Sequence, residues 1–105
     1  MNLQELAANL GLEEDEYKEL IELFVDTGMA DFRKMESAMA DKDTDQVMRS
    51  AHTIKGAAGN LGLIDVSETA KIIEQQADSD QMDNLVRTVE TLKTQFETIQ
   101  TMVQA

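Results

Sequence analysis

The sequence contains no cysteine, no proline and no tryptophan, and its 105 residues include a single histidine. Without cysteine, neither a disulfide framework nor a thiolate metal site can form. One histidine also falls short of the several histidines, or Glu-x-x-His pairs, that zinc and di-iron sites require. We therefore expect no metal and no cofactor to be bound by this chain.

Aromatic residues are also scarce, at 4% of the chain. Alanine, leucine, glutamate, glutamine, lysine and methionine are plentiful, and these residues favour helices over strands. The length is sufficient for one domain with a single modest core. The sequence thus predicts an all-α fold in which residues 1–105 form one domain.

Positively charged residues are scarce as well. The chain has 9 lysines and arginines against 21 aspartates and glutamates, which gives a formal net charge of −12. Such a surface repels phosphate backbones and anionic lipid, which disfavours nucleic acid and membranes as partners. The N-terminus lacks a basic segment followed by an apolar run, and no stretch reaches membrane-spanning length. We expect a soluble, cytoplasmic protein that binds other proteins.

Apolar residues recur at helical spacing along most of the chain and predict five helices. A short helix at about 2–10 precedes four longer ones, at about 13–40, 44–61, 63–78 and 80–103. Short connections make consecutive helices antiparallel. This order predicts an up-down-up-down four-helix bundle with a short N-terminal capping helix.

The last helix carries the most regular apolar stripe, with spacings of three and four residues: Met82, Leu85, Val89, Leu92, Phe96, Ile99 and Val103. Such a stripe could form a coiled-coil seam between chains. Because other amphipathic helices are available, one wall of an intramolecular bundle explains it better. We therefore expect a monomer.

An acidic segment precedes the third predicted helix and invites comparison with a calcium-binding loop. Counted from Asp41, acids fill positions one, three and five. However, position six is Gln46, where a glycine is needed, and position twelve is His52, where a glutamate is needed. The calcium hypothesis fails, and capping of the next helix by Asp43 or Thr44 explains the segment.

The only histidine, His52, lies within the stretch Ala51–Gly62 (AHTIKGAAGNLG) of the third predicted helix. Lys55, Gly56 and Gly59 follow it by three, four and seven residues and therefore share its face. Each interior glycine costs a helix about 1 kcal/mol relative to alanine, so two on one face require a reason. Access is the simplest: the imidazole stands on a strip bare of side chains, beside one ammonium, as a phosphoryl carrier requires. A histidine without function would leave these neighbours unexplained.

Phosphoryl transfer demands little of such a domain, because its loose transition state depends mainly on positioning and charge stabilisation. His52 lies mid-helix, where the backbone N–H groups are already bonded, so side-chain cations must supply local positive charge. Lys55 can contact the phosphoryl oxygens, and Arg49 on the preceding turn can assist. Acyl transfer is disfavoured because no serine lies in a strand-to-helix elbow. The glycines fit neither a dinucleotide nor a P-loop fingerprint.

The stretch from Ala51 to Gly62 resembles the signature of the histidine-containing phosphotransfer (HPt) domain of bacterial two-component phosphorelays. The likeness extends to the flanking helices, Leu23–Glu36 before it and Leu63–Glu74 after it. The resemblance implies a phosphocarrier without autonomous kinase activity, which accepts a phosphoryl group on Nε2 of His52. The donor would be a receiver-domain aspartate or a sensor histidine kinase, and the acceptor a response regulator. Mg²⁺ is expected on the receiver partner.

The resemblance also suggests a role for Glu74. In the related domain of chemotaxis kinases, a glutamate at the corresponding place accepts a hydrogen bond from Nδ1–H of the histidine. Such a bond fixes the tautomer and leaves Nε2 as the nucleophile, as an acid does for histidine elsewhere. An ordinary surface carboxylate is the alternative.

Partner docking is the least determined feature. Val25 and Met29 lie beside the core stripe of the second helix, four residues apart. They either widen the core face or, with Met48, form an apolar docking patch next to His52. A helical adaptor that binds signalling partners without carrying phosphate is the alternative function. The start at Met1 favours a free-standing protein over a piece of a hybrid kinase.

Overall fold

The computed structural model describes residues 2–79 and 82–104. Within them lie five α-helices: α1 (Leu3–Asn9), α2 (Glu14–Ala40), α3 (Thr44–Asn60), α4 (Ile64–Asp78) and α5 (Met82–Gln104). No described residue belongs to a strand, which confirms the predicted all-α class. The helix ends coincide with the predicted ones at Ala40, Thr44 and Asp78 and otherwise lie one residue away, while the predicted start at residue 80 lies outside the described residues.

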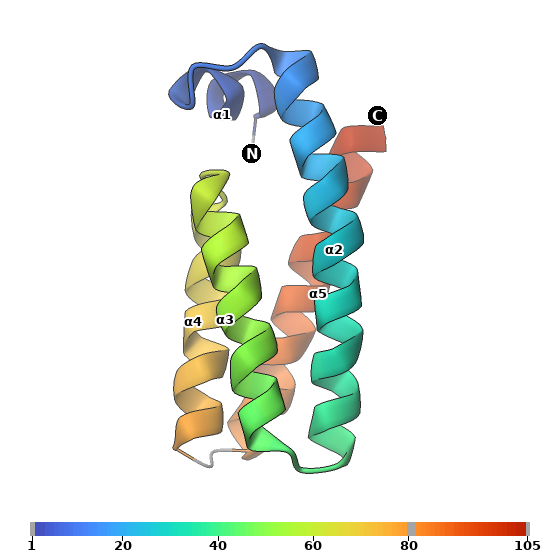
Figure 1. Ribbon diagram of the computed structural model, residues 1–105, viewed down its shortest axis with the longest axis vertical. Coiled ribbons are helices and arrows are strands. Elements are labelled where there is room, and N and C mark those ends of the chain that lie inside the picture. Colours follow the sequence, from blue (N-terminus) through green and yellow to red (C-terminus); the bar gives the residue numbers. More distant parts are fainter. Residues whose placement is uncertain (1, 80–81, 105) are drawn as a thin grey trace.

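The four long helices lie side by side along the 41 Å long axis of the molecule, and α1 crosses one end beside the start of α2 (Figure 1). Helix α3 packs against both α2 and α4, and α5 also packs against both of them. The four helices therefore surround one shared core, and α3 and α5 do not contact each other through their backbones.

The core is built from the apolar stripes that the sequence predicts. The described members of the α5 stripe are all buried within the chain: Leu85, Val89, Leu92, Phe96, Ile99 and Val103. The side chain of Met82 lies outside the described parts. Because these residues pack against the chain's own helices, the stripe serves as a wall of the core, and no intermolecular seam is needed to cover it.

Phe96 fixes how closely α2 approaches α5. Its ring stacks on Phe24, with centroids 5.4 Å apart, and meets Phe32 edge-on at 6.3 Å. A Cβ at Gly28 would lie 2.6 Å from Cε1 of Phe96, which is closer than real atoms approach. Glycine at this position therefore makes room for the ring, and the helix tolerates it in exchange for tight packing.

The two ends of α3 are fixed by side chains of the connecting segments and of α2. At its start, Oδ1 of Asp43 accepts a hydrogen bond from the backbone N–H of Gln46 at 3.1 Å, which confirms the capping prediction. At its end, the buried Tyr17 donates its hydroxyl to the carbonyl of Leu61. Gly62 then turns the chain with φ +75, a left-handed value that glycine adopts without strain. Both ends of the helix that carries His52 are thus held in place.

Candidate functional site

His52 points into solvent from the middle of α3, and its side chain is 70% exposed. This orientation follows from the helix period, because the inward face of α3 is occupied by small and branched apolar residues, all buried: Val47, Ala51, Ile54 and Ala58. His52 follows Ala51 directly and therefore lies about 100° around the helix from the buried face. The imidazole is accessible without any opening of the fold.

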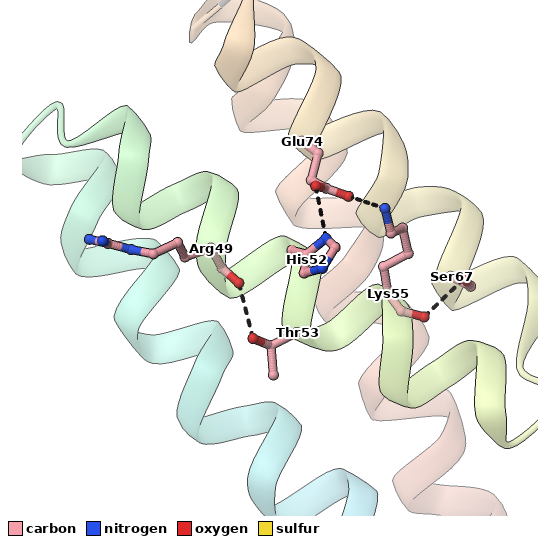
Figure 2. Close-up of polar contacts among 6 residues, drawn as sticks. All are labelled: Arg49, His52, Thr53, Lys55, Ser67 and Glu74. Atoms are coloured by element: carbon pink, nitrogen blue, oxygen red, sulfur yellow. Dashed lines mark hydrogen bonds and ion pairs between the residues drawn. The ribbon is translucent and has the colours of Figure 1, made fainter.

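The Glu74 carboxylate of α4 joins His52 to Lys55 (Figure 2). Its Oε2 atom lies 3.2 Å from Nδ1 of His52, and its Oε1 atom lies 2.6 Å from Nζ of Lys55. An ionised carboxylate can only accept, so the ring proton is assigned to Nδ1, which donates to Oε2. The Nε2 atom is left with a free lone pair on the exposed edge of the ring.

Glu74 is suited to remain ionised at neutral pH. Its side chain is 21% exposed, and this burial alone would raise its pKa. The close contact with the positively charged Lys55, followed by the hydrogen bond and charge of His52, outweighs the burial and lowers the pKa of Glu74 below its ordinary value of 4.5. The Oε1 atom is itself buried and makes no hydrogen bond of good geometry among the described residues, so its contact with Lys55 is a charge pairing.

The two glycines beside His52 are not required by packing within the domain. A Cβ at Gly56 would meet nothing within 4 Å, and a Cβ at Gly59 would make only an ordinary contact with Oγ of Ser67 at 3.6 Å. Both positions are exposed. At Gly28, by contrast, the space that a side chain would need is occupied by the ring of Phe96. The surface at Gly56 and Gly59 therefore leaves room for another molecule to approach His52.

Ser67 of α4 supports the site, and sequence reasoning missed it. Its hydroxyl donates to the backbone carbonyl of Lys55 at 3.1 Å (Figure 2). This bond ties α4 to α3 one turn beyond His52. No sequence pattern reveals it, because the contact depends on how the two helices are set against each other.

Arg49 does not join this cluster. Its guanidinium donates to Oε1 of Gln46 at 3.3 Å, and Figure 2 shows its side chain directed away from His52. Its backbone carbonyl accepts from Oγ1 of Thr53 at 3.1 Å. In this arrangement, Lys55 is the cation paired with Glu74, and Arg49 stands apart.

The predicted docking residues separate in the structure. Val25 is only 6% exposed and packs in the core, at the edge of a hollow that α5 lines with Val103, so it cannot belong to a docking patch beside His52. The sequence pattern marks Val25 as apolar but does not show which helix covers it. Met29 is half-buried against the core. Met48 is half-buried at the junction with α4, in a hollow that includes Lys55 and Glu74.

An exposed apolar groove on the other flank of α3 was not predicted. Leu20 and Leu23 of α2 are 40% and 60% exposed. They line a groove of ≈270 Å³ between α2 and α3 together with Phe24, Thr27, Ala57, Asn60 and Leu61. Ala57 and Asn60 follow His52 by about one and two turns of α3. The spacing of Leu20, Leu23 and Thr27 by three and four residues is the signal that could have identified this second stripe.

The described residues contain neither a cluster of metal-binding side chains nor a helix that could cross a membrane. Across residues 2–79 and 82–104, no three histidine, cysteine or acidic side chains gather closely enough to hold a metal ion. None of the helices in that part of the chain is both long and apolar enough to span a membrane.

A family model and a solved structure of known proteins match this chain. The family model described as the Hpt domain matches residues 19–104. Among solved structures, histidine-containing phosphotransfer protein B (HptB) from Pseudomonas aeruginosa has a similar fold, with a TM-score of 0.83 at 23% sequence identity, over 94% of this chain and 86% of that one. No curated protein matches the sequence. Because the family model covers most of the sequence, the chain belongs to the Hpt domain family, the histidine-containing phosphotransfer domains of two-component phosphorelays.

Proposed function

We propose that this protein is a phosphorelay intermediate that carries a phosphoryl group on Nε2 of His52. One observation carries the proposal: an exposed imidazole whose Nδ1 is held by Glu74, with the Lys55 ammonium paired to the same carboxylate. The two glycines on the same face leave room for a partner to approach the ring. Membership of the Hpt family supports the same chemistry.

Transfer proceeds by in-line displacement at phosphorus. The lone pair of Nε2 forms a bond to phosphorus while the bond to the aspartate oxygen of a receiver domain breaks, and the electron pair of that bond returns to the carboxylate. Charge spreads over the phosphoryl oxygens during this step. Lys55, paired with Glu74 on the turn after His52, is the cation that this domain would offer to those oxygens. A Mg²⁺ ion held by the receiver would supply further positive charge. This domain therefore supplies the nucleophile and one cation, without kinase activity of its own.

The docking surface comprises the His52 face of α3 and the adjoining groove toward α2. Leu20 and Leu23 offer exposed aliphatic surface there, which a partner would bury. Receiver domains of response regulators and the receiver or kinase part of a sensor histidine kinase would use this surface in turn. The donor thus loads His52, and the acceptor unloads it, over the same patch.

The fold suits a carrier that works as a monomer. We take the four long helices as an antiparallel up-down-up-down bundle capped by α1, since only residues 41–43, 61–63 and 79–81 connect them. The contacts of α5 with both α2 and α4 close such a bundle. A single chain then buries its own apolar stripes and presents the site on one helix.

The test is transfer from a panel of receiver domains phosphorylated with acetyl phosphate, followed by intact-mass measurement. We expect one added phosphoryl group that is labile in acid and stable in base, as a phosphoramidate is. His52→Gln should remain unmodified while still binding the receiver. Phosphorylation of His52→Gln would place the phosphoacceptor on another residue and contradict the role of His52. No transfer from the whole panel to the unaltered protein would favour an adaptor that only binds signalling partners.

A further inference from the structure

Glu74 contacts the ring nitrogen opposite the one that carries the phosphoryl group in the proposed function. Its Oε2 atom lies 3.2 Å from Nδ1 of His52, on the side of the ring that faces α4 (Figure 2). A partner approaching Nε2 from solvent leaves this contact in place. The carboxylate can therefore act on the ring after phosphorylation as well as before it.

The proton on Nδ1 decides whether a phosphorylated imidazole can give up its phosphoryl group. When Nε2 bonds to phosphorus and Nδ1 keeps its proton, the ring becomes a cation. Onward transfer from that cation releases neutral imidazole, which is a good leaving group. If Nδ1 has lost its proton, the same step must release an imidazolate anion, which is a poor one.

Resting on the proposed function, we infer that Glu74 is a positioning residue that retains the Nδ1 proton of phosphorylated His52 and so keeps the phosphoryl group transferable. The relay cycle then needs no proton movement. In loading, the phosphorus–oxygen bond to the donor aspartate breaks and the phosphorus–Nε2 bond forms. In unloading, the phosphorus–Nε2 bond breaks, its electron pair returns to Nε2, and an oxygen of the acceptor aspartate bonds to phosphorus. Nδ1–H stays bonded to Oε2 throughout.

The charges around the ring favour this assignment. From α4, Glu74 is the acid that contacts the ring among the described residues, while Lys71 and Asp78 line the hollow beside it and offset each other. From α3, the Lys55 ammonium would oppose a cationic ring, but it is paired with the other oxygen of Glu74. The phosphoryl group adds negative charge on the far side of the ring.

The remaining neighbours of α3 and α4 do not alter that balance. Arg49 of α3 is bonded to Gln46 and directed away from the ring (Figure 2). On α2, Glu22 and Asp26 line a hollow against α5 instead of facing the site. The low pKa of Glu74, which Lys55 and His52 maintain against its burial, keeps the carboxylate available as the acceptor.

The test loads His52 chemically, with potassium phosphoramidate, so that it does not depend on any partner. The ¹⁵N NMR signals of the phosphorylated ring are followed against pH in the unaltered protein, in Glu74→Gln and in Asp78→Asn. The glutamine keeps the size and an acceptor oxygen but loses the charge. We expect its Nδ1 to lose the proton about one pH unit lower than in the unaltered protein, the usual effect of removing an adjacent opposite charge. Asp78→Asn removes one negative charge from the same hollow and should titrate as the unaltered protein does.

A second readout is the rate of onward transfer to a receiver. Above both midpoints the protonated fraction, and hence the rate, should be about tenfold lower in Glu74→Gln, and the two rates should converge at lower pH. The inference would be overturned if Nδ1 titrated identically in Glu74→Gln and in the unaltered protein. It would also be overturned if Asp78→Asn shifted the titration as much as Glu74→Gln does. If the receivers accept nothing from the loaded protein, the relay function fails while the titration still decides the role of Glu74. Failure of phosphoramidate to modify His52 would contradict both.

Discussion

The two flanks of α3 differ in chemistry. Toward α4, His52, Lys55 and Glu74 form a polar cluster with a partly buried carboxylate at its centre. Toward α2, Leu20 and Leu23 leave aliphatic surface exposed beside Ala57 and Asn60. In the proposed function, the flank toward α4 prepares the reacting imidazole, and the flank toward α2 holds the partner. Variants on each flank should therefore fail in different ways.

The largest effect on transfer, short of losing His52, is expected on the polar flank. Lys55→Gln removes the cation that the proposed function assigns to the phosphoryl oxygens, and loss of one such charge-stabilising donor lowers rates roughly a hundredfold to a thousandfold. Binding of the receiver should change little, because the apolar groove is untouched. Single-turnover transfer measured with saturating receiver separates the two quantities. A weakened Kd with an unchanged rate would assign Lys55 to docking instead.

The apolar flank should show the converse behaviour. Leu23→Ser removes exposed aliphatic surface that a partner would bury, and burial of a leucine side chain contributes about 1.5–3 kcal/mol, so the Kd should rise about tenfold or more. Chemical phosphorylation of His52 should proceed as before. Val86→Ser on α5 is the matched control, since Val86 is 54% exposed against 60% for Leu23 and lies on a helix whose backbone stays apart from that of α3. Equal weakening by both substitutions would remove the groove from the docking surface.

Two glycines sharpen the contrast between surface and core. Gly56→Ala places a methyl group in open space, so the better helix former should stabilise the fold by about 1 kcal/mol, while the added bulk slows transfer. Gly28→Ala drives a methyl group into the buried Phe96 ring and should destabilise the fold by about 1–3 kcal/mol. Urea unfolding measures both. A destabilised Gly56→Ala protein would show that this glycine serves the fold and not access.

The smallest effect concerns the pH dependence of stability. Because the folded-state pKa of Glu74 is lowered, its ion pairs stabilise the protein above the ordinary value of 4.5, and this contribution is lost as the pH falls through the lower folded-state value. The contribution should be below about 1 kcal/mol, as for most partly exposed pairs. Glu74→Gln should therefore lower the free energy of unfolding at neutral pH and match the unaltered protein in strong acid. A difference that persists in acid would indicate lost packing.

The parts of the site that depend on one helix could be predicted from the sequence. The shared face of His52, Lys55, Gly56 and Gly59 follows from the helical period alone. The all-α class follows equally from composition and apolar spacing. The place of Glu74 could not be worked out in this way, because its 22-residue separation from His52 fixes no distance until two helices are packed together. Only the family resemblance directed attention to it.

Packing between helices also explains why the sequence did not place Val25 and Arg49 correctly. Val25 and Leu23 are both apolar residues near the middle of α2, yet one is buried near α5 and the other lies in the open groove beside α3. Periodicity shows which positions are apolar, whereas the neighbouring helices decide which of them are covered. Arg49 is a similar case, because its long side chain has a nearby partner, Gln46, on its own helix.

We propose Nε2 of His52 as the phosphoacceptor, with Nδ1 bonded to Glu74 throughout. The most direct measurement is a ¹⁵N NMR spectrum of the histidine ring after transfer from a phosphorylated receiver domain. We predict coupling to phosphorus at Nε2 and a retained proton at Nδ1. Phosphorus coupled to Nδ1, or a phosphoryl group on any other residue, would contradict it.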